Sequence, residues 1–321
     1  IQYAREFDMT NDSELFRPRP WWEARGYRPD EYGRWLKGRW HEARLPGPRC
    51  DMEPGVILSV DGSAWIHEDE IEDAALPLYQ GVMIWQLDFS AAVYRGGSGS
   101  LAKWVKTEWE RKAIESQYLI SQDTAREAAY WATSLRLGFR DVQNATNQRT
   151  MIACLIPGFP CGNTVPILRT GCYSTDLGLL TALVSFPLDR VLRMKMSQNH
   201  VNWFYVSELP IPRYLGMAAM NAAMLRNVSL LTAAGEQFAP LWLWTGLTSA
   251  YGRRWALTHH ERLRLRCMLD AIVAELYGLG WDDLSWILRE CDYPADRVQD
   301  SAFARTLDPK GFWRVDKDRD P

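Results

Sequence analysis

Short apolar runs separated by polar turns characterise the first part of the chain and predict β-strands there. Residues 56–67 contain two such runs, joined by Asp61 and Gly62. An Asp-Gly pair between short apolar runs is typical of a tight hairpin turn. Residues 76–88 have a similar pattern around Gly81 and predict a strand, a sharp turn and a second strand.

Helical periodicity becomes clear in the second half of the chain. Residues 175–194 carry a leucine-rich apolar face, and Thr175 or Asp176 is expected to cap the start of this helix. Pro187 lies inside the segment. It predicts a kink or an interruption, since proline cannot donate the helical backbone hydrogen bond.

From Met217 onward the chain is rich in Ala, Leu and Met at helical spacing. Thr258 and Glu261 form a capping-box pattern, and Gly278 is a suitable C-terminal glycine, so a helix is expected between them. Residues 281–289 predict a second short helix. Together the patterns predict a mixed α/β fold, in which a β-containing target domain precedes a helical C-terminal region.

Composition divides the chain into three regions. Residues 1–55 are rich in Arg, Trp, Pro and acidic residues and are expected to form an extended arm or connector. Residues 56–215 are expected to form the mixed α/β domain, and residues 216–321 the helical C-terminal region. Because the chain begins at Ile1 and runs at once into a structured-looking segment, we expect it to be a fragment of a longer protein.

A polar stretch at residues 139–150 (FRDVQNATNQRT) precedes an apolar run at residues 151–157 (MIACLIP). Asparagine, glutamine and arginine side chains form paired hydrogen bonds with base edges and phosphates, so the polar half is a candidate DNA surface. The apolar half is expected to be a buried strand. The alternative interpretation is a capped turn before a core strand. The candidate DNA contacts are Arg140, Gln143, Asn144, Asn147 and Arg149.

A second polar loop repeats this arrangement. Residues 197–202 (SQNHVN) precede an apolar run at residues 203–206 that is expected to be a strand. Two such loops in one chain indicate a shared polar surface. The candidate DNA contacts in the second loop are Gln198, Asn199, His200 and Asn202.

Four cations supply candidate phosphate contacts. Lys103 and Lys106 lie among tryptophans in a segment that is expected to be helical, and Arg193 and Lys195 lie at the end of the helix predicted for residues 175–194. The alternative role of the two lysines is a solvated face. For Arg193 and Lys195 the alternative is a favourable interaction with the helix dipole.

The composition is that of a folded protein with a sizeable core, because 47% of the residues are hydrophobic and 24% are charged. The net charge of −3 argues against a nucleic-acid coat over the whole surface, but it allows one basic face. The 6 cysteines form no CxxC pair and no zinc-finger spacing with histidine, which favours buried free thiols in a reducing cytoplasm. No apolar run has the length of a membrane span, and no signal-peptide pattern opens the sequence.

Motifs of common enzyme classes are absent, since the sequence has no GxSxG, HExxH, P-loop or dinucleotide-binding motif. One catalytic alternative rests on Asp88, Glu110 and Lys112, which fit the loose Asp…Glu-x-Lys pattern of metal-dependent nucleases. That pattern is common by chance, and Glu110 is expected on a helix rather than on a strand. We therefore assign no catalytic and no metal-binding residue.

Several segments, in order along most of the chain, resemble the C-terminal specificity region of adenine-specific DNA methyltransferases. The resemblance is to fused type II restriction–modification enzymes and related phage-defence methylases in particular. The similar segments are residues 5–16, residues 76–88 (LPLYQGVMIWQLD), residues 139–157, residues 199–210 (NHVNWFYVSELP) and residues 269–279 (LDAIVAELYGL).

This resemblance implies target recognition without catalysis. The family's acid–Pro–Pro–aromatic methylase motif and its glycine-rich loop for S-adenosylmethionine are absent from this sequence. Both are therefore expected in an upstream methyltransferase domain of the full-length protein, and this chain needs no cofactor of its own. It is expected to bind double-stranded DNA, read bases and hold the duplex while the target adenine is flipped out of the helix.

Two other functions stay open. The chain is a metal-dependent nuclease fragment if Asp88, Glu110 and Lys112 act together. It is a protein-interaction module of a phage-defence complex if its tryptophans and acidic patches form a docking surface for other defence-system proteins.

Overall fold

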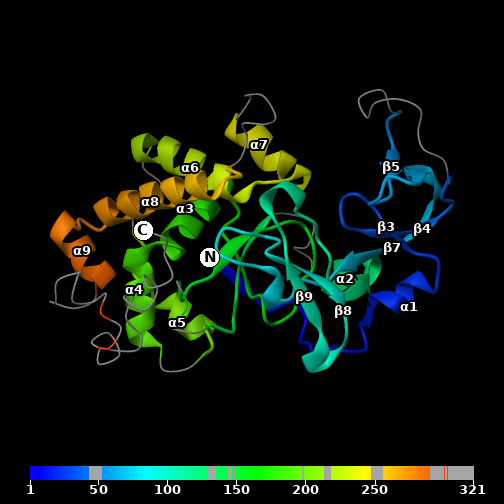
Figure 1. Cartoon of the computed structure of the whole chain (residues 1–321), viewed down its shortest axis with the longest axis horizontal. Helices are drawn as coiled ribbons and strands as arrows, with labels where there is room; N and C mark the ends of the chain where they lie inside the picture. Colours follow the sequence, from blue (N-terminus) through cyan, green and yellow to red (C-terminus); the bar gives the residue numbers. More distant parts are fainter. Residues whose placement is uncertain are drawn as a thin grey trace.

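The computed structural model has a mixed α/β fold, which confirms the fold class expected from the sequence (Figure 1). It describes residues 1–42, 53–128, 135–143, 147, 149–196, 199–212, 218–246, 256–289, 300 and 302. Within these ranges every β-strand precedes Tyr173, and most of the longer helices follow it. The order of a β-rich part and a helical part is therefore as expected.

Two antiparallel sheets and two separate hairpins contain the β-strands. The five-stranded sheet has the order β2 (Phe16–Pro18), β10 (Tyr118–Ser121), β7 (Ile71–Pro77), β4 (Trp35–Gly38) and β3 (Arg28–Pro29). The four-stranded sheet has the order β1 (Gln2–Ala4), β13 (Ile167–Arg169), β11 (Arg136–Phe139) and β12 (Ala153–Ile156). The hairpins pair β5 (Val56–Leu58) with β6 (Trp65–His67), and β8 (Ala92–Gly96) with β9 (Lys103–Lys106).

Helices cover the sheets and form the C-terminal region. The α-helices are α1 (Arg19–Glu23), α2 (Gln122–Ala128), α3 (Tyr173–Leu183), α4 (Phe186–Lys195), α5 (Trp203–Ser207), α6 (Ala218–Thr232), α7 (Ala239–Thr245), α8 (His259–Leu276) and α9 (Trp281–Arg289). Short 3-10 helices are η2 (Glu68–Glu70), η3 (Gly81–Met83), η4 (Gly99–Leu101), η5 (Trp109–Arg111) and η6 (Glu236–Phe238). In the part of the chain that the structure describes, no helix combines the length and apolar character needed to cross a membrane.

The Asp-Gly hairpin is confirmed. Ile57 of β5 lies opposite Ile66 of β6, and Gly62 has a φ of 66°, a conformation that favours glycine. The carboxylate of Asp61 accepts hydrogen bonds from the hydroxyl groups of Ser59 and Ser63. The exposed carboxylate of Asp61 therefore stabilises the turn.

The second strand expected within residues 76–88 does not form, and that prediction is wrong. β7 ends at Pro77, η3 follows, and Trp85 and Asp88 then close a tight turn through two backbone hydrogen bonds of 2.9 and 3.1 Å. Leu87, inside this turn, has a φ of 59° and is buried. The run is apolar because it packs in the core, not because it pairs in a sheet.

The helix expected at residues 175–194 is interrupted, as Pro187 predicted. α3 ends and α4 begins within this segment, and Pro187 lies in the first turn of α4. At that position the N–H that proline lacks would have no helical acceptor, so the residue is well tolerated.

The caps predicted for this segment are wrong. The residue at the N-cap of α3 is Cys172, and neither Thr175 nor Asp176 occupies that position. Asp176 instead accepts hydrogen bonds from the backbone amide (2.9 Å) and the hydroxyl (2.8 Å) of Thr170. Its carboxylate thus fixes the chain between β13 and α3.

The helix expected around Lys103 and Lys106 is also wrong, because both residues lie on β9. Tyr94 of β8 lies opposite Trp104 of β9, and the two rings pack edge to face with centroids 5.6 Å apart. Aromatic pairs across neighbouring strands stabilise a hairpin. This contact between two strands favours a strand over a helix at residues 103–106, and the sequence of that segment alone does not reveal it.

The strand expected at residues 203–206 is wrong as well, because this run belongs to helix α5. Trp203 at the start of the helix stacks on Tyr3 from the N-terminal segment, with ring centroids 4.8 Å apart. Packing against a distant segment overrides the β-propensity of an aromatic run.

Residues 1–42, which belong to the arm or connector expected for residues 1–55, supply strands to both larger sheets. A buried ion pair between Glu6 and Arg136 fastens this segment to β11, and both side chains are at most 2% exposed. Glu6 also accepts a hydrogen bond from the amide of Cys161, and Arg136 donates one to the carbonyl of Phe159. The N-terminal segment is therefore part of the central fold.

One apolar core joins the four-stranded sheet to the helices that follow it. Leu137 and Leu155 from the sheet, Leu180 from α3 and Leu269 from α8 belong to the same cluster of buried side chains. Residues 151–157 supply β12, which confirms the expected buried strand. Figure 1 shows α3, α6 and α8 beside one another, and these helices pack together.

The helix predicted between Thr258 and Gly278 is confirmed as α8. The Thr258 hydroxyl accepts a hydrogen bond from the amide of Glu261 (3.2 Å), as the capping-box pattern predicts. Gly278, after the helix end, has a φ of 69°. The second short helix is confirmed as α9.

Replacing Glu6 by Gln is expected to lower the free energy of unfolding by about 3–5 kcal/mol, because it leaves the buried guanidinium of Arg136 without a counter-charge. Urea denaturation followed by circular dichroism measures the change. Glu14→Gln is the matched control, since Glu14 is exposed; its effect should stay within about 0.5 kcal/mol. Equal losses in the two variants would contradict a special role for the buried pair.

Replacing Thr258 by Ala is expected to lower the free energy of unfolding by about 1 kcal/mol, because the Glu261 amide loses its acceptor. Thr258→Ser keeps the hydroxyl oxygen and serves as the control. Thermal unfolding of the three proteins side by side measures the effect. A serine variant as unstable as the alanine variant would show that the cap hydrogen bond is not the cause.

Candidate nucleic-acid interface

The two polar loops singled out in the sequence are neighbours in the structure. Val142 of the first loop and His200 of the second lie opposite each other in an isolated antiparallel β-bridge. The backbone hydrogen bonds beside this bridge run from the Gln143 amide to the Asn199 carbonyl and from the Val201 amide to the Asp141 carbonyl, each 2.8 Å long. Two segments almost sixty residues apart in sequence are thus fixed to each other by their main chains.

The carboxylate of Asp141 is the centre of this contact. One of its oxygens, Oδ1, accepts a hydrogen bond from Nη2 of Arg5 (2.9 Å), and the other, Oδ2, lies 2.9 Å from Nδ1 of His200. The Asp141 side chain is 9% exposed, whereas those of Arg5 and His200 are 41% and 56% exposed. A nearly buried carboxylate therefore orients two exposed cationic or polar groups.

The N-terminal segment supports the same surface. Nε of Arg5 donates a hydrogen bond to the hydroxyl of Tyr3 (2.8 Å). Tyr3 in turn stacks on Trp203, just beyond the second polar loop. Three separate parts of the chain therefore restrain Arg5 and His200.

Arg140 contributes a half-buried positive charge next to this contact. Its side chain lies over Gly81, where a Cβ atom would be only 3.4 Å from Cγ of Arg140 and 3.2 Å from the carbonyl oxygen of Thr164. Glycine at position 81 therefore makes room for the arginine. Burial lowers the pKa of the Arg140 guanidinium. No hydrogen bond or ion pair joins this guanidinium to a described residue.

The structure corrects two candidate contacts in the first loop, because their side chains point into the protein. Gln143 is 2% exposed, and its amide group donates to the carbonyl of Arg140 (3.0 Å). Arg149 is 3% exposed, pairs with Asp270 of α8 (2.7 Å) and lies over the ring of Phe186. Both side chains are buried and support the loop from the protein interior, so they are not available to contact DNA at the loop surface.

Arg193 is corrected for the same reason. It is 1% exposed and pairs with Asp189, four residues earlier on α4, at 2.8 Å. Its Nη2 donates to the carbonyl of Asn147 (2.6 Å), and Asp189 also accepts from the amide of Met151 (2.7 Å). The pair anchors the second half of the first loop to α4, instead of contacting phosphate.

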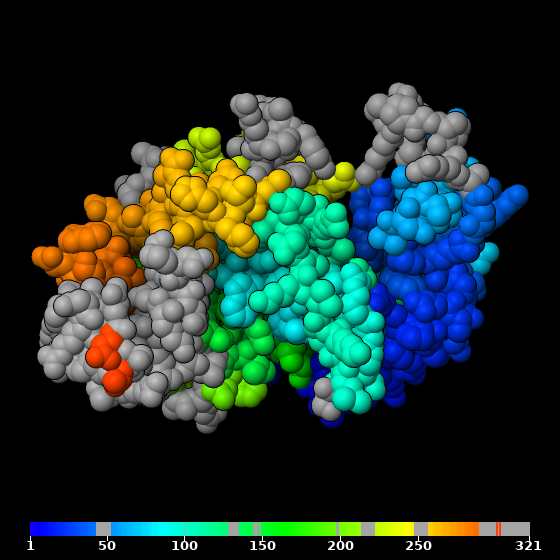
Figure 2. Space-filling view, in the orientation of Figure 1, coloured from blue at the N-terminus to red at the C-terminus, as the bar shows by residue number. Residues whose placement is uncertain are grey.

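The remaining candidates have different degrees of exposure. Asn199, Lys103, Lys106 and Lys195 are exposed, and Asn147 and Asn202 are half-buried. Lys195 pairs with Glu208 (2.8 Å). Figure 2 shows the β8–β9 hairpin, which carries Lys103 and Lys106, as an exposed ridge between the N-terminal part and the helices. Asn144 and Gln198 lie outside the described residues.

Sequence reasoning missed Asp141 and the contribution of the N-terminal segment. Asp141 is the single acidic residue within the stretch 139–150, and an acid among arginines and amides is a signal of an internal ion pair. The partnership of Arg5 had no such signal, because it is 136 residues away in the sequence. The pairing of β1 with β13 and the ion pair of Glu6 with Arg136 bring it close.

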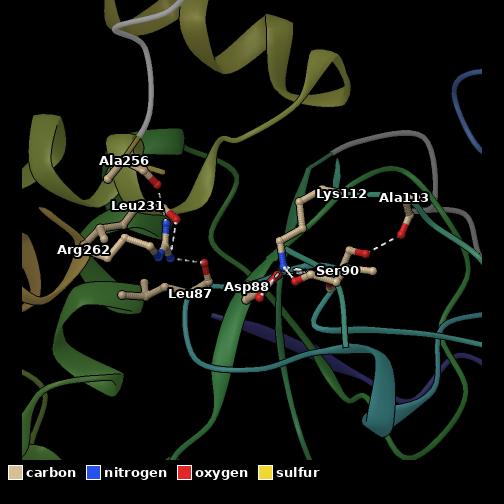
Figure 3. Close-up of polar contacts among 9 residues, drawn as sticks. Leu87, Asp88, Ser90, Lys112, Ala113, Leu231, Ala256 and Arg262 are labelled. Atoms are coloured by element: carbon tan, nitrogen blue, oxygen red, sulfur yellow. Dashed lines mark hydrogen bonds and ion pairs between the residues drawn. The ribbon is translucent and has the colours of Figure 1, made fainter. Parts of the chain in front are cut away.

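Asp88 and Lys112, from the nuclease alternative, do meet, but in a closed structural cluster (Figure 3). Nζ of Lys112 donates to Asp88 (2.7 Å) and to the carbonyls of Ser90 (2.9 Å) and Thr107 (3.1 Å). The ammonium group therefore has no donor free to activate a water. Burial lowers the pKa of Lys112, and the nearby Asp88 opposes this shift. Glu110 takes no part in the cluster.

Arg262 of α8 approaches this cluster from the other side (Figure 3). Its guanidinium lies 3.3 Å from the ring centre of Trp109, and Lys112 lies 4.1 Å from the same ring. It also donates to the carbonyls of Ala256, Leu231 and Leu87. Burial lowers the pKa of Arg262 to about 9, although the Asp88 charge opposes the shift. The cluster attaches the helical region to the Leu87–Ser90 turn.

The described residues contain no cluster of candidate metal ligands. Across those residues, no group of three or more His, Cys, Asp or Glu side chains is arranged to hold a metal ion. The contact between the two polar loops places Arg140, His200 and Asn199 on segments that are joined by backbone hydrogen bonds.

Comparison with known proteins adds no assignment, because no protein-family model, curated protein or solved structure matches this chain.

Proposed function

We propose that this chain is the DNA target-recognition part of an adenine-N6 DNA methyltransferase or restriction–modification enzyme. In this role it binds duplex DNA and reads its sequence. An upstream domain that binds S-adenosylmethionine carries out the methylation, so the chain is not catalytic in isolation. The proposal combines the sequence resemblance with the chemistry of the surface formed by the two polar loops.

The observation that carries the proposal is the half-buried guanidinium of Arg140, which has no hydrogen-bond or ion-pair partner among the described residues. A half-buried charge without a counter-ion costs free energy, and chains keep such a group where a ligand supplies the partner. Arginine is the side chain best suited to paired hydrogen bonds with guanine or with a phosphate. The neighbouring His200 and Asn199 add further polar groups of the kind that contact base edges.

The overall charge of −3 is compatible with this role. Duplex DNA needs one basic face rather than a basic protein, and the phosphate contacts determine affinity while the base contacts determine specificity. Exposed Lys103 and Lys106 on the β8–β9 ridge are suited to phosphates, because lysine acts as a flexible point charge.

Replacing Arg140 by Ala is expected to weaken binding of the full chain to duplex DNA by about 1–3 kcal/mol, roughly 5- to 150-fold, because one charge-assisted contact is lost. Fluorescence anisotropy with labelled duplexes at low salt measures the affinity. Arg39→Ala removes the same kind of charge from an exposed position just after β4 and should have little effect. Equal losses in both variants would mean that only net charge matters and would contradict the proposed site.

Replacing Lys103 and Lys106 together by Ala is expected to reduce the slope of log affinity against log salt by about 2, because each phosphate contact contributes about one unit. Titrations of duplex DNA between low and physiological salt measure this slope. Lys37→Ala combined with Arg39→Ala is the control, since it removes the same charge from β4 and the residue that follows it. A wild-type affinity that does not depend on salt would instead favour a protein-interaction module.

A further inference from the structure

We infer that His200 reads the exocyclic amino group of a base in the major groove through its Nε2 atom, and that Asp141 positions it for this task. The inference rests on the proposed function and makes it specific. The group recognised by His200 follows from which of its two imidazole nitrogens carries the proton.

The proton position follows from the partner of Nδ1. This nitrogen lies 2.9 Å from Oδ2 of Asp141. A carboxylate can only accept a hydrogen bond, so Nδ1 must be the donor and must carry the proton. In the neutral imidazole the other nitrogen, Nε2, then has a lone pair and can only accept. The carboxylate thus fixes one of the two tautomers.

The surroundings of Asp141 keep this arrangement in place. Its other oxygen is occupied by the guanidinium of Arg5, which is itself held by Tyr3. The β-bridge between Val142 and His200 fixes the backbone on either side. The carboxylate therefore cannot turn away, and a side chain held in this way suits a site that must distinguish one base from another.

An accepting Nε2 selects among the groups that DNA presents. Phosphate oxygens, guanine O6 and N7, adenine N7 and thymine O4 are all acceptors, and a neutral His200 of this tautomer cannot bond to them. The donors on the major-groove edges are the amino groups of adenine and cytosine. The His200 side chain is 56% exposed, and no described residue bonds to its Nε2.

The neighbouring Val142 favours adenine over cytosine. Residues opposite each other in an antiparallel bridge have Cβ atoms about 5 Å apart, so the valine lies next to the imidazole. Val142 is 43% exposed. In an A·T pair the thymine methyl group, which makes apolar contacts, lies on the same major-groove edge as the adenine amino group, beyond thymine O4, whereas a G·C pair has no methyl group there. His200 and Val142 together match the A·T edge.

The tautomer is tested first, on the full chain without DNA. Long-range proton–nitrogen NMR at pH 8 should show that His200 carries its proton on Nδ1, with the signal assigned by its loss in His200→Gln. In Asp141→Asn, Arg5 can only donate, so the asparagine carbonyl should face Arg5 and its NH₂ group should face Nδ1. The proton of His200 should then move to Nε2. A proton on Nε2 in the wild type would overturn the inference.

The base contact is tested by selecting bound duplexes from a library with randomised positions. Wild-type protein should enrich A·T at one position, and His200→Ala should lose roughly 5- to 150-fold discrimination at that position alone. Replacing that adenine by purine, which lacks the amino group, should weaken wild-type binding and leave His200→Ala unaffected. His260→Ala, which removes an exposed imidazole from α8, is the matched control and should select the same site as wild type.

The outcomes separate the inference from the proposed function. If wild type binds duplex DNA selectively but His200→Ala selects the same site, or loses affinity equally for every sequence, the inference fails and the proposed function stands. If the wild type binds no duplex DNA at all, both fail. Loss of discrimination at one A·T position, with the other positions unchanged, supports both.

Discussion

Three buried guanidinium groups pair with carboxylates, and two of these pairs join distant parts of the chain. Arg136, Arg149 and Arg193 are each at most 3% exposed. Their carboxylate partners are Glu6 near the N-terminus, Asp270 on α8 and Asp189 on α4. Because removing one partner of such a pair leaves an uncompensated interior charge, the three pairs restrict how the sheets and helices fit together.

The same constraint divides the first polar loop into an inner and an outer face. Gln143 and Arg149 point inward and support the loop, whereas Arg140 has no partner in the part of the chain that the structure describes and Val142 is exposed. Asp141 connects the two faces, because its nearly buried carboxylate bonds to the exposed imidazole of His200. A surface that must distinguish bases needs side chains held in one geometry, and here the ion pairs beneath the loop supply that rigidity.

Features that are stabilised by contacts between residues close in sequence could be predicted from the sequence. The hairpin around Gly62, the interruption at Pro187 and the cap at Thr258 each depend on contacts within a few residues, and the structure confirms all three. The segments that contain Lys103 and Trp203 were assigned to the wrong element, because aromatic packing against another segment decides them. A short apolar or mixed run carries too little information to choose between a strand and a helix.

The sequence by itself determined the mixed α/β class, the helical C-terminal region and the presence of two amide-rich polar loops, the first of which also carries arginines. Only the tertiary structure decided which of those arginines lie inside, since Arg140 and Arg149 belong to one stretch but have opposite environments. The buried Arg149 is paired with the carboxylate of Asp270, which is 121 residues away in the sequence. Likewise, the orientation of His200 by Asp141 and Arg5 exists only once the chain has folded, because long-range contacts create it.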